Sequence, residues 1–374
     1  MSAEKISLTT EGDHRDEIRR AARILADGGL VAFPTETVYG VAANAANESA
    51  VKRLRALKGL TTDQPFTVHI GRREDWGDFV SVRSAMAERF VRKGWPGPLT
   101  LILPVEDPSR TKVHERLGEL GSRSIYANGT VSIRFPDYPA AEQLLSESGV
   151  PVIASGANLP GDAVPTDGDG LETGLGDRVD VILDGGPTRY RKVSTVVSVD
   201  GNGYKLLREG VWDARTIRSL ATLQVLFVCS GNTCRSPMAE GLFRHMMAER
   251  IGCRDDELAM RGVVIRSAGT SAHGGGGVSE EAVGVCLQRG VDIAGHRSQR
   301  LAMELIHSAD YIYTMAAHHA DVVRSLVPSA AWKVTTLAGD EEITDPIGGS
   351  VDEYVRVADR IELALKKRLD EVSP

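Results

Sequence analysis

Cysteines, aromatic residues and long apolar runs are all scarce in this sequence. Four cysteines among 374 residues are too few for the disulfide framework of a small secreted protein. No apolar run approaches the roughly 20 residues of a membrane-spanning helix. The N-terminal residues are polar and lack the apolar segment of a signal peptide. These absences predict a protein of the reducing cytoplasm that does not enter a membrane.

The chain also has no excess of positive charge, because its formal net charge is −7. Contact with a nucleic acid would therefore require a local basic patch. The apolar fraction of 42% and the charged fraction of 25% are ordinary for a globular protein. A chain of this length predicts two or three domains rather than one.

One stretch, QVLFVCSGNTCRS at Gln224 to Ser236, carries a strong chemical signal. An apolar run ends at Cys229, and Arg235 follows after five intervening residues. Pro237 then opens a helical pattern, in whose first turn its missing N–H costs nothing. A buried strand, a short polar loop and a helix N-terminus form a cradle for a dianion, because the loop amides and the helix dipole converge there.

The residues of this loop have the chemistry of a phosphoryl-transfer site. Cys229 should ionise near neutral pH, because the field that binds a dianion also stabilises a thiolate. Arg235 can hold two phosphoryl oxygens through its planar guanidinium. The alternative, an inert core thiol, does not account for the arginine, the loop glycine and the Ser-Pro pair. The predicted phosphate loop comprises Ser230, Gly231, Asn232, Thr233 and Cys234.

Alternating strand and helix patterns over residues 224–374 predict a doubly wound, parallel sheet of four strands. Cys229 would then lie at the carboxyl end of the first strand, where such sheets bind ligands. Transfer of a phosphoryl group to a thiolate also needs a proton donor for the departing atom. Asp345, which precedes Pro346 after the fourth strand, is the candidate, although an Asp-Pro pair by itself is more often only a turn.

Together these features resemble the low-molecular-weight protein phosphatases. The further motifs of that family here read SAGT (267–270), GVDIAGHRS (290–298), ADYIYTM (309–315) and the late Asp-Pro. The resemblance implies a phosphocysteine intermediate on Cys229, with Asp345 as general acid and then as base for water. It implies that Ser236 hydrogen-bonds the thiolate and that Asn232 holds the shape of the loop. It implies no cofactor and no metal for this half.

The substrate of this half stays open between phosphoarginine and phosphotyrosine on proteins. Thr233 resembles the protein-arginine phosphatases, in which a threonine replaces an aliphatic residue, and this favours phosphoarginine. A thiol-dependent arsenate reductase is a further alternative. That class needs a resolving cysteine near the nucleophile, and Cys253 and Cys286 lack the expected placement. Cys234 either forms a reversible disulfide with Cys229 or packs in the core.

The histidines of this half show no metal-like pairing with carboxylates or cysteines. They are His273, His296, His318 and His319. We expect His318 and His319 to be solvated at the start of a helix.

The first 211 residues predict an α/β or α+β domain, because strand and helix patterns alternate with several turn signals. Residues 212–223 are expected to form a short connector. The ordered motifs of this part are PTETVYG, KG…P…VH, WPGPLT, SIRFP, ASGAN, LDGG, STVV and LREG. They resemble the YrdC-type threonylcarbamoyl-AMP synthases over nearly the whole domain. The resemblance implies a twisted mixed sheet with a basic concave groove.

The same resemblance implies an activity and a set of ligands. The family makes threonylcarbamoyl-adenylate from threonine, bicarbonate and ATP, with Mg²⁺, for the N6-threonylcarbamoyladenosine modification of tRNA. Implied partners are tRNA, other double-stranded RNA or tRNA-modification proteins. The positions that match threonine-binding residues are Thr35, His69, Arg134 and Ser194. The positions that match ATP-binding residues are Lys58, Thr130, Asn158 and Arg208.

Four positions depart from the pattern of that family. Leu60 stands where an arginine is expected on the phosphates, and Gln64 where an asparagine is expected. Gly156 replaces a serine that contacts the nucleotide, and Ala154 replaces a hydroxyl of the threonine site. The loss of one arginine–phosphate contact costs on the order of a few kcal/mol. The alternative therefore stays open that this half binds nucleotide or RNA without turnover.

Overall fold

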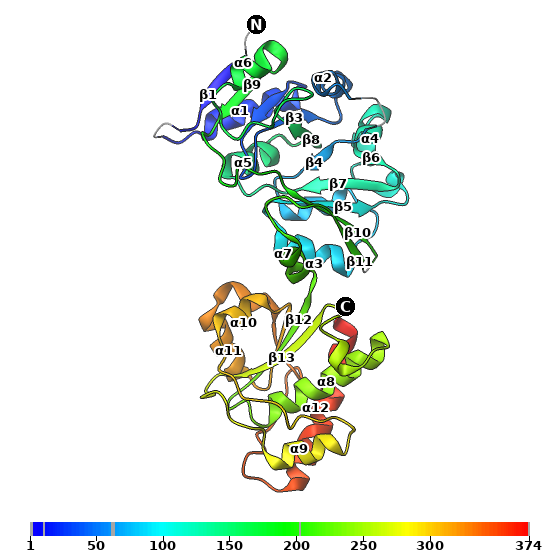
Figure 1. Cartoon of the computed structure of the whole chain (residues 1–374), viewed down its shortest axis with the longest axis vertical. Helices are drawn as coiled ribbons and strands as arrows, with labels where there is room; N and C mark the ends of the chain where they lie inside the picture. The colour runs from blue at the N-terminus through cyan, green and yellow to red at the C-terminus, as the bar shows by residue number, and fades with distance from the viewer. Residues whose placement is uncertain (1–2, 10–11, 61–63, 202, 373–374) are drawn as a thin grey trace. The chain divides into compact units, whose positions relative to one another are not determined.

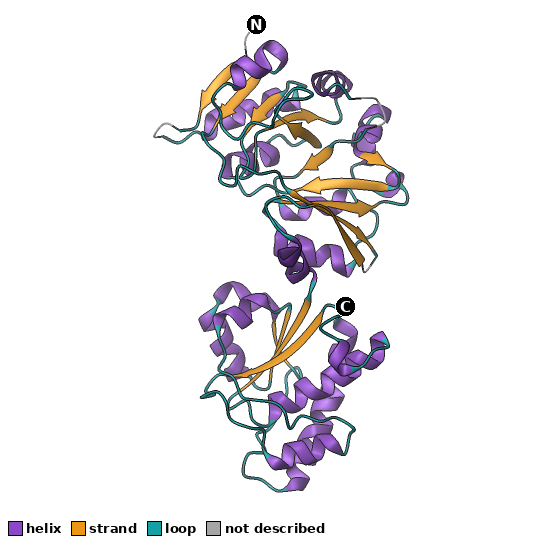
Figure 2. Cartoon of the chain, viewed as in Figure 1, coloured by secondary structure: helices purple, strands orange, loops and turns teal. Residues whose placement is uncertain are grey.

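The computed structural model describes residues 3–9, 12–60, 64–201 and 203–372 (Figures 1 and 2). It divides into two compact units, Met1–Ala221 and Thr222–Pro374. The expected connector, residues 212–223, contains helix α7 (Ala214–Ala221), whose Ile217 and Ala221 are buried in the core of the first unit. Among the described helices, none combines the length and the apolar character that crossing a bilayer requires.

The first unit is built on one mixed sheet. Its described strands are β1 (Glu4–Ser7), β2 (Val31–Phe33), β3 (Gly40–Asn44), β4 (Thr67–His69), β5 (Leu99–Pro104), β6 (Tyr126–Ala127), β7 (Thr130–Arg134), β8 (Val152–Gly156), β9 (Val181–Asp184), β10 (Thr195–Asp200) and β11 (Gly203–Arg208). Their order is β1-β9-β2-β3-β8-β4-β7-β5-β10-β11, with β6 paired to β7. Parallel pairing joins β1 and β2 to β9, β4 to β7 and β5 to β10, and the other pairs are antiparallel. This confirms the predicted mixed sheet.

Apolar cores lie on both faces of this sheet. The helices are α1 (Arg15–Ala26), α2 (Glu48–Lys58), α3 (Ala85–Gly94), α4 (Glu119–Ile125), α5 (Pro139–Glu147), α6 (Leu171–Leu175) and α7. Side chains alternate between the faces along each strand. Val31 and Phe33 of β2 therefore pack with α1 and α5, whereas Ala32 packs in the core that contains α2 and α3.

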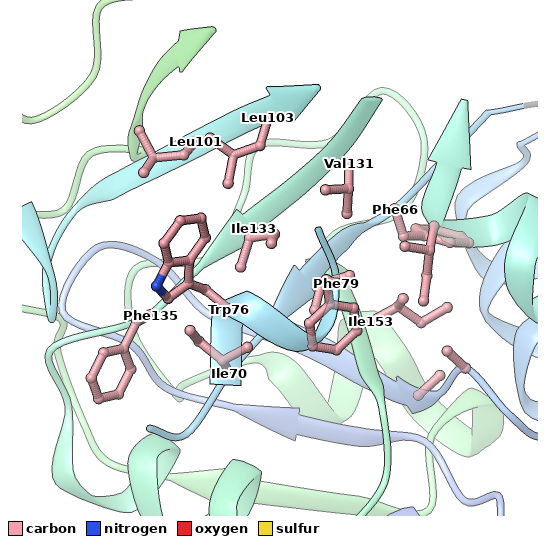
Figure 3. Close-up of a cluster of buried hydrophobic side chains, with 14 of the residues drawn as sticks. Phe66, Ile70, Trp76, Phe79, Leu101, Leu103, Val131, Ile133, Phe135 and Ile153 are labelled. Atoms are coloured by element: carbon pink, nitrogen blue, oxygen red, sulfur yellow. The ribbon is translucent and has the colours of Figure 1, made fainter. Parts of the chain in front are cut away.

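Figure 3 shows the centre of the larger core, where Trp76 and Phe79 gather with Leu101 of β5 and Ile133 of β7. Burial of an apolar side chain of this size contributes about 1.5–3 kcal/mol. This core therefore fixes the register of the central strands, whose ends supply the first candidate site.

The second unit is a parallel sheet with helices on both faces. Its described strands are β12 (Leu223–Cys229), β13 (Val263–Gly269), β14 (Tyr311–Thr314) and β15 (Val334–Thr336), in the order β13-β12-β14-β15. Its helices are α8 (Arg235–Ile251), α9 (Glu280–Leu287), α10 (Met303–Ser308), α11 (Ala317–Leu326) and α12 (Val351–Glu371). All three strand pairs are parallel, which confirms the predicted doubly wound, four-stranded sheet.

Alternation along β12 decides where each of its side chains points. Val225, Phe227 and Cys229 belong to the core formed with α8, α9 and α12, whereas Leu226 and Val228 belong to the core formed with α10 and α11. β12 lies between β13 and β14. The carboxyl end of β12 is therefore the switch point where open α/β sheets bind ligands, and Cys229 lies there.

Candidate active sites

A cavity of about 370 Å³ in the first unit contains most of the residues predicted to bind its ligands. Its lining includes all four positions matched to threonine binding, Thr35, His69, Arg134 and Ser194, and one position matched to ATP binding, Arg208. Strand pairing aligns His69 of β4 with Arg134 of β7, and Arg134 with Thr100 of β5. Segments that are far apart in the sequence therefore form one site.

Arg134 is buried and held by residues next to Thr35. Its Nη2 donates to Glu36 Oε1 at 2.9 Å and to Thr37 Oγ1 at 2.7 Å. The Glu36 carboxylate is fully buried and also accepts the Asp137 N–H at 3.2 Å. Arg134 Nε is also buried and has no partner among the described residues. The sequence reasoning missed Glu36 and Thr37, although both belong to the PTETVYG motif.

His69 is a neutral hydrogen-bonding group in this cavity. Burial, and secondarily the charge of Arg134, lower its pKa from 6.5 to about 3. Its Nδ1 lies 3.1 Å from the carbonyl oxygen of Thr67. Because that oxygen can only accept, Nδ1 carries the proton and Nε2 is left as an acceptor. His69 can therefore accept a hydrogen bond from a ligand hydroxyl.

Ser194 joins Arg208 to the sheet. Its Oγ lies 2.9 Å from Thr100 Oγ1. Arg208 Nη2 donates to the carbonyl oxygen of Ser194 at 3.0 Å and to its Oγ at 3.2 Å. Arg208 is otherwise exposed, so its charge is available to an anion at the mouth of the cavity.

The other three positions matched to ATP binding do not line this cavity. Lys58 Nζ donates to the carbonyl oxygen of Gly156 at 2.9 Å, and to Asn158 O and Oδ1 at 2.5 and 2.7 Å. Burial lowers the pKa of Lys58. Thr130 Oγ1 donates to the carbonyl oxygen of Ala127 at 3.0 Å. Lys58 and Asn158 are therefore hydrogen-bonded to each other. Lys58 Nζ must break these hydrogen bonds before it can bind a phosphate.

Three of the departures from the family pattern line the cavity, namely Leu60, Ala154 and Gly156. A Cβ on Gly156 would lie 3.0 Å from both Asn158 Oδ1 and Val164 Cγ1. A serine at this position would therefore require the side chains of Asn158 and Val164 to shift slightly.

The cavity does not offer a protein-built site for Mg²⁺. No Asp or Glu is among the described residues that line it, and Mg²⁺ prefers carboxylate and phosphate oxygens. The described part of the chain contains no cluster of three metal-ligating His, Cys, Asp or Glu residues. The phosphates of a bound nucleotide would therefore have to hold the ion.

The phosphate loop of the second unit surrounds the sulfur of Cys229. The loop joins β12 to α8, and Asn232 has a left-handed backbone with φ of 57°. This conformation turns the Asn232 N–H toward Cys229 Sγ, at 3.2 Å. The Ser236 hydroxyl lies 2.9 Å from the same sulfur. The Asn232 N–H thus donates to the sulfur, and the Ser236 hydroxyl is placed to do so as well; donors of this kind favour the thiolate form of a cysteine.

The side chain of Asn232 holds this loop in place. Its Nδ2 donates to Ser236 Oγ at 2.9 Å and to Ser267 Oγ at 2.8 Å. Its Oδ1 accepts the Gln299 N–H at 2.8 Å and lies 3.3 Å from His296 Nε2. The sequence reasoning did not assign Ser267, His296 or Gln299, although Ser267 and His296 lie within the SAGT and GVDIAGHRS motifs and Gln299 directly follows the second.

Arg235 and Asp345, the predicted phosphate ligand and proton donor, are in direct contact. Arg235 Nη2 forms an ion pair with the Asp345 carboxylate, and Nη1 donates to the carbonyl oxygen of Ile343 at 3.0 Å. The Arg235 side chain is 6% exposed and that of Asp345 is 40% exposed. The carboxylate therefore lies at the mouth of the loop, where a departing atom could receive its proton.

His319 corrects the expectation of a solvated histidine pair. It lies in the first turn of α11 and is fully buried, whereas His318 is exposed. His319 Nε2 lies 2.8 Å from Ser230 Oγ of the phosphate loop. Burial, His318 and Arg235 lower the pKa of His319 to about 4. The spacing of the sequence alone could not show this contact, because it joins the segments that follow two neighbouring strands, β12 and β14, which lie far apart in the sequence.

Cys234 packs behind the loop. It is buried, and its Sγ lies 3.4 Å from Tyr354 Oη and 3.5 Å from Ser279 Oγ. Both Cys229 and Cys234 are free thiols.

Gly269, at the end of β13, allows the phosphate loop to approach this strand, since a Cβ there would lie 2.4 Å from the carbonyl oxygen of Ser230.

Comparison with known proteins matches each unit to one family. Residues 23–210 match the Sua5/YciO/YrdC family model, described as telomere recombination. Residues 224–373 match the low-molecular-weight phosphotyrosine protein phosphatase model. A threonylcarbamoyl-AMP synthase of Bacillus subtilis is 39% identical over 206 residues, which are 55% of this chain and 57% of that protein. A protein-arginine-phosphatase of Bacillus subtilis is 35% identical over 150 residues, which are 39% of this chain and 93% of that protein.

A solved structure of a Sua5 variant from Pyrococcus abyssi is similar in fold. Its TM-score is 0.52 at 24% identity, and the match covers 80% of this chain and 98% of that one. The chain spans 57% and 54% of the length of the threonylcarbamoyl-AMP synthases from Bacillus subtilis and Pyrococcus abyssi. The likeness thus extends over about half of the length of these two synthases.

We predict that Glu36→Ala destabilises the first unit by about 3 kcal/mol or more, because it leaves the Arg134 charge buried without its partner. Urea unfolding followed by tryptophan fluorescence measures this, since Trp76, Trp95 and Trp212 lie in the first unit. Glu48→Ala is the control. Glu48 pairs with Lys52 at 3.3 Å, with both side chains more than half exposed, and its loss should cost under about 1 kcal/mol. Equal effects of the two substitutions would contradict the prediction.

We also predict that acid destabilises the first unit through His69. Its pKa is about 3 when folded and about 6.5 when unfolded, so below pH 6.5 the unfolded chain binds the extra proton. The His69 contribution is therefore fully present above pH 6.5 and falls as the pH drops toward 3, by at most about 1.4 kcal/mol per pH unit. Urea unfolding at pH 7, 6 and 5 should show a smaller slope for His69→Gln than for wild type. His14→Gln should keep the wild-type slope, and a His69→Gln slope equal to wild type would refute the assignment.

Proposed function

Since the chain belongs to the Sua5/YciO/YrdC family over residues 23–210 and to the low-molecular-weight phosphotyrosine protein phosphatase family over residues 224–373, we propose that it is a bifunctional enzyme. The first unit makes threonylcarbamoyl-AMP from threonine, bicarbonate and ATP, for modification of tRNA. The second unit hydrolyses phosphoarginine on proteins. The cytoplasm suits this pair of reactions, because the second needs a reduced thiol at Cys229.

The clustering of Thr35, His69, Arg134 and Ser194 in one cavity supports the synthase proposal. Arg134 pairs with the threonine carboxylate, and His69 Nε2 accepts the threonine hydroxyl. The threonine nitrogen forms a C–N bond with bicarbonate, and water leaves. A carbamate oxygen then attacks the α-phosphorus of ATP, and the bond to pyrophosphate breaks. Arg208 offsets the charge of the phosphates, so this chain mainly positions the reactants and neutralises their charge.

The hydrogen bonds of Lys58 favour a second candidate function for the first unit. Lys58 and Asn158 are bonded to each other rather than directed into the cavity, and Leu60 supplies no charge for a phosphate. The competing proposal is a module that binds a nucleotide or RNA, with tRNA or a tRNA-modification protein as its partner, without turnover.

The two donors at Cys229 Sγ carry the phosphatase proposal. The thiolate attacks phosphorus, an S–P bond forms, and the bond from phosphorus to the leaving atom breaks. The phosphoryl group takes Arg235 from its ion pair with Asp345, and Asp345, in its protonated form, gives its proton to the departing atom. Water then attacks phosphorus while Asp345 takes the water proton, the S–P bond breaks, and inorganic phosphate leaves. Arg235 and the loop amides hold the phosphoryl oxygens through both steps.

Phosphoarginine is the proposed substrate in preference to phosphotyrosine. Thr233 places a hydroxyl in the loop, which can accept a hydrogen bond from a guanidinium N–H, and a phenol offers no such donor. The 35% identity to a protein-arginine-phosphatase supports the same choice. Arsenate reduction is disfavoured, because Cys286 is buried in α9 and burial raises its pKa to about 11, which makes it a poor resolving thiol.

We predict that Cys229→Ser abolishes hydrolysis of an aryl phosphate by the full chain, because a serine hydroxyl stays protonated at neutral pH. Asp345→Asn should slow hydrolysis by about 100-fold or more, the range of a lost general acid. Cys253→Ser, which changes a half-buried thiol at the end of α8, is the matched control.

Peptides that carry phosphoarginine should be hydrolysed faster than those that carry phosphotyrosine. Full turnover by Cys229→Ser would exclude the phosphatase mechanism, and the reverse substrate order would exclude only the choice of phosphoarginine.

For the first unit, purified chain with threonine, bicarbonate and ATP should release pyrophosphate and form threonylcarbamoyl-AMP. Arg208→Gln should lower kcat/KM for ATP by about tenfold or more, the scale of one charged hydrogen bond. Arg123→Gln is the control, since that side chain is 67% exposed and pairs with Glu119 within its own helix. Absence of pyrophosphate from wild type, together with measurable binding of ATP, would support the non-catalytic module instead.

A further inference from the structure

A buried histidine contacts the phosphate loop of the second unit from outside it. His319 lies in the first turn of α11, and its Nε2 is 2.8 Å from Ser230 Oγ. We propose that His319 is a positioning residue for the phosphatase site, which fixes the Ser230 hydroxyl so that it donates its hydrogen to a phosphoryl oxygen. This inference rests on the proposed phosphatase function.

Burial decides which ring nitrogen of His319 carries the proton. The low pKa, about 4, keeps the ring neutral at physiological pH, so one nitrogen donates and the other accepts. Nδ1 is buried and has no partner among the described residues. A buried N–H without an acceptor is rarer in folded proteins than a buried acceptor without a donor. The proton therefore lies on Nε2, which donates it to Ser230 Oγ.

The contacts of Ser230 Oγ then restrict the direction in which its own hydrogen can point. Ser230 Oγ also lies 3.4 Å from Arg235 Nη2, which can only donate. His319 and Arg235 together occupy the two lone pairs of this oxygen. Its own hydrogen must therefore point away from both donors, and it can donate to an oxygen of a phosphoryl group held in the loop.

This arrangement adds the Ser230 hydroxyl to the hydrogen-bond donors of the phosphate loop. The hydroxyl does not have to be reoriented during the reaction. The His319 ring is enclosed by the core of the unit, so the hydroxyl is oriented before the substrate arrives. Hydrogen bonds to charged oxygens are about twice as strong as neutral ones. The loss of this one should therefore be visible in the binding of a phosphate dianion as well as in turnover.

The test measures hydrolysis of an aryl phosphate by the full chain and four variants, His319→Leu, His319→Gln, Ser230→Ala and the double variant His319→Leu with Ser230→Ala. His319→Leu and Ser230→Ala should each lower kcat/KM by about tenfold or more. His319→Gln, whose amide nitrogen can take the place of Nε2, should stay within about threefold of wild type. The double variant should lose no more than either single one, because both remove the same hydrogen bond. Inhibition by inorganic phosphate should weaken in parallel.

Several results would overturn the proposal. Multiplicative losses in the double variant would show that His319 does not act through Ser230. Unchanged turnover in Ser230→Ala would also overturn the proposal, whatever the His319 variants show. Thermal unfolding of each variant separates these outcomes from misfolding, and His319→Phe, which keeps a flat ring, replaces His319→Leu if the latter unfolds. His318→Gln, at the exposed neighbour, is the control and should keep wild-type turnover.

The wild-type chain and Cys229→Ser decide whether the phosphatase function itself holds. If wild type hydrolyses the aryl phosphate, Cys229→Ser does not, and His319→Leu retains the wild-type rate, then only the role of His319 is refuted. If wild type and Cys229→Ser are equally inactive, the phosphatase function fails, and the proposal for His319 fails with it.

Discussion

The second site depends on the backbone conformation of Asn232. A left-handed residue other than glycine is strained, and here φ is 57°. Four hydrogen-bond contacts of the Asn232 side chain, to Ser236, Ser267, Gln299 and His296, offset that strain. The result is an N–H that points at Cys229 Sγ. Without this conformation the Asn232 N–H would not reach the Cys229 sulfur.

The first site uses buried charge in a related way. Arg134 can remain at the floor of the cavity because Glu36 neutralises it and Thr37 accepts one of its hydrogens. A buried pair of this kind adds little net stability, but it keeps the Arg134 charge in the lining of the cavity. In both units, residues that lie mostly within the recognised motifs hold a buried polar group in place through hydrogen bonds.

The two sites differ in how much of them could be predicted. The phosphate loop is contiguous in sequence, so Cys229, Ser236 and the residues between them lie together whatever the rest of the chain does. The first site comes from β4, β7 and the loops after β2 and before β10, and its composition depends on strand register. Lys58 and Thr130 illustrate this, because both match ATP-binding positions yet neither lines the cavity. His319 is a further case, since its contact with Ser230 depends on β12 and β14 being neighbours in the sheet.

The sequence by itself determined the two fold classes, the strand that ends in Cys229, and the types of group available for chemistry. Strand and helix periods and glycine or proline signals are local properties, so they can be read along the chain. Only the tertiary structure decided that Arg235 meets Asp345, that Glu36 holds Arg134, that Lys58 bonds to Asn158, and that His319 is buried against Ser230. These contacts depend on which strands are neighbours and on which face each side chain takes, and a shift of one residue in register would reverse every one of those faces.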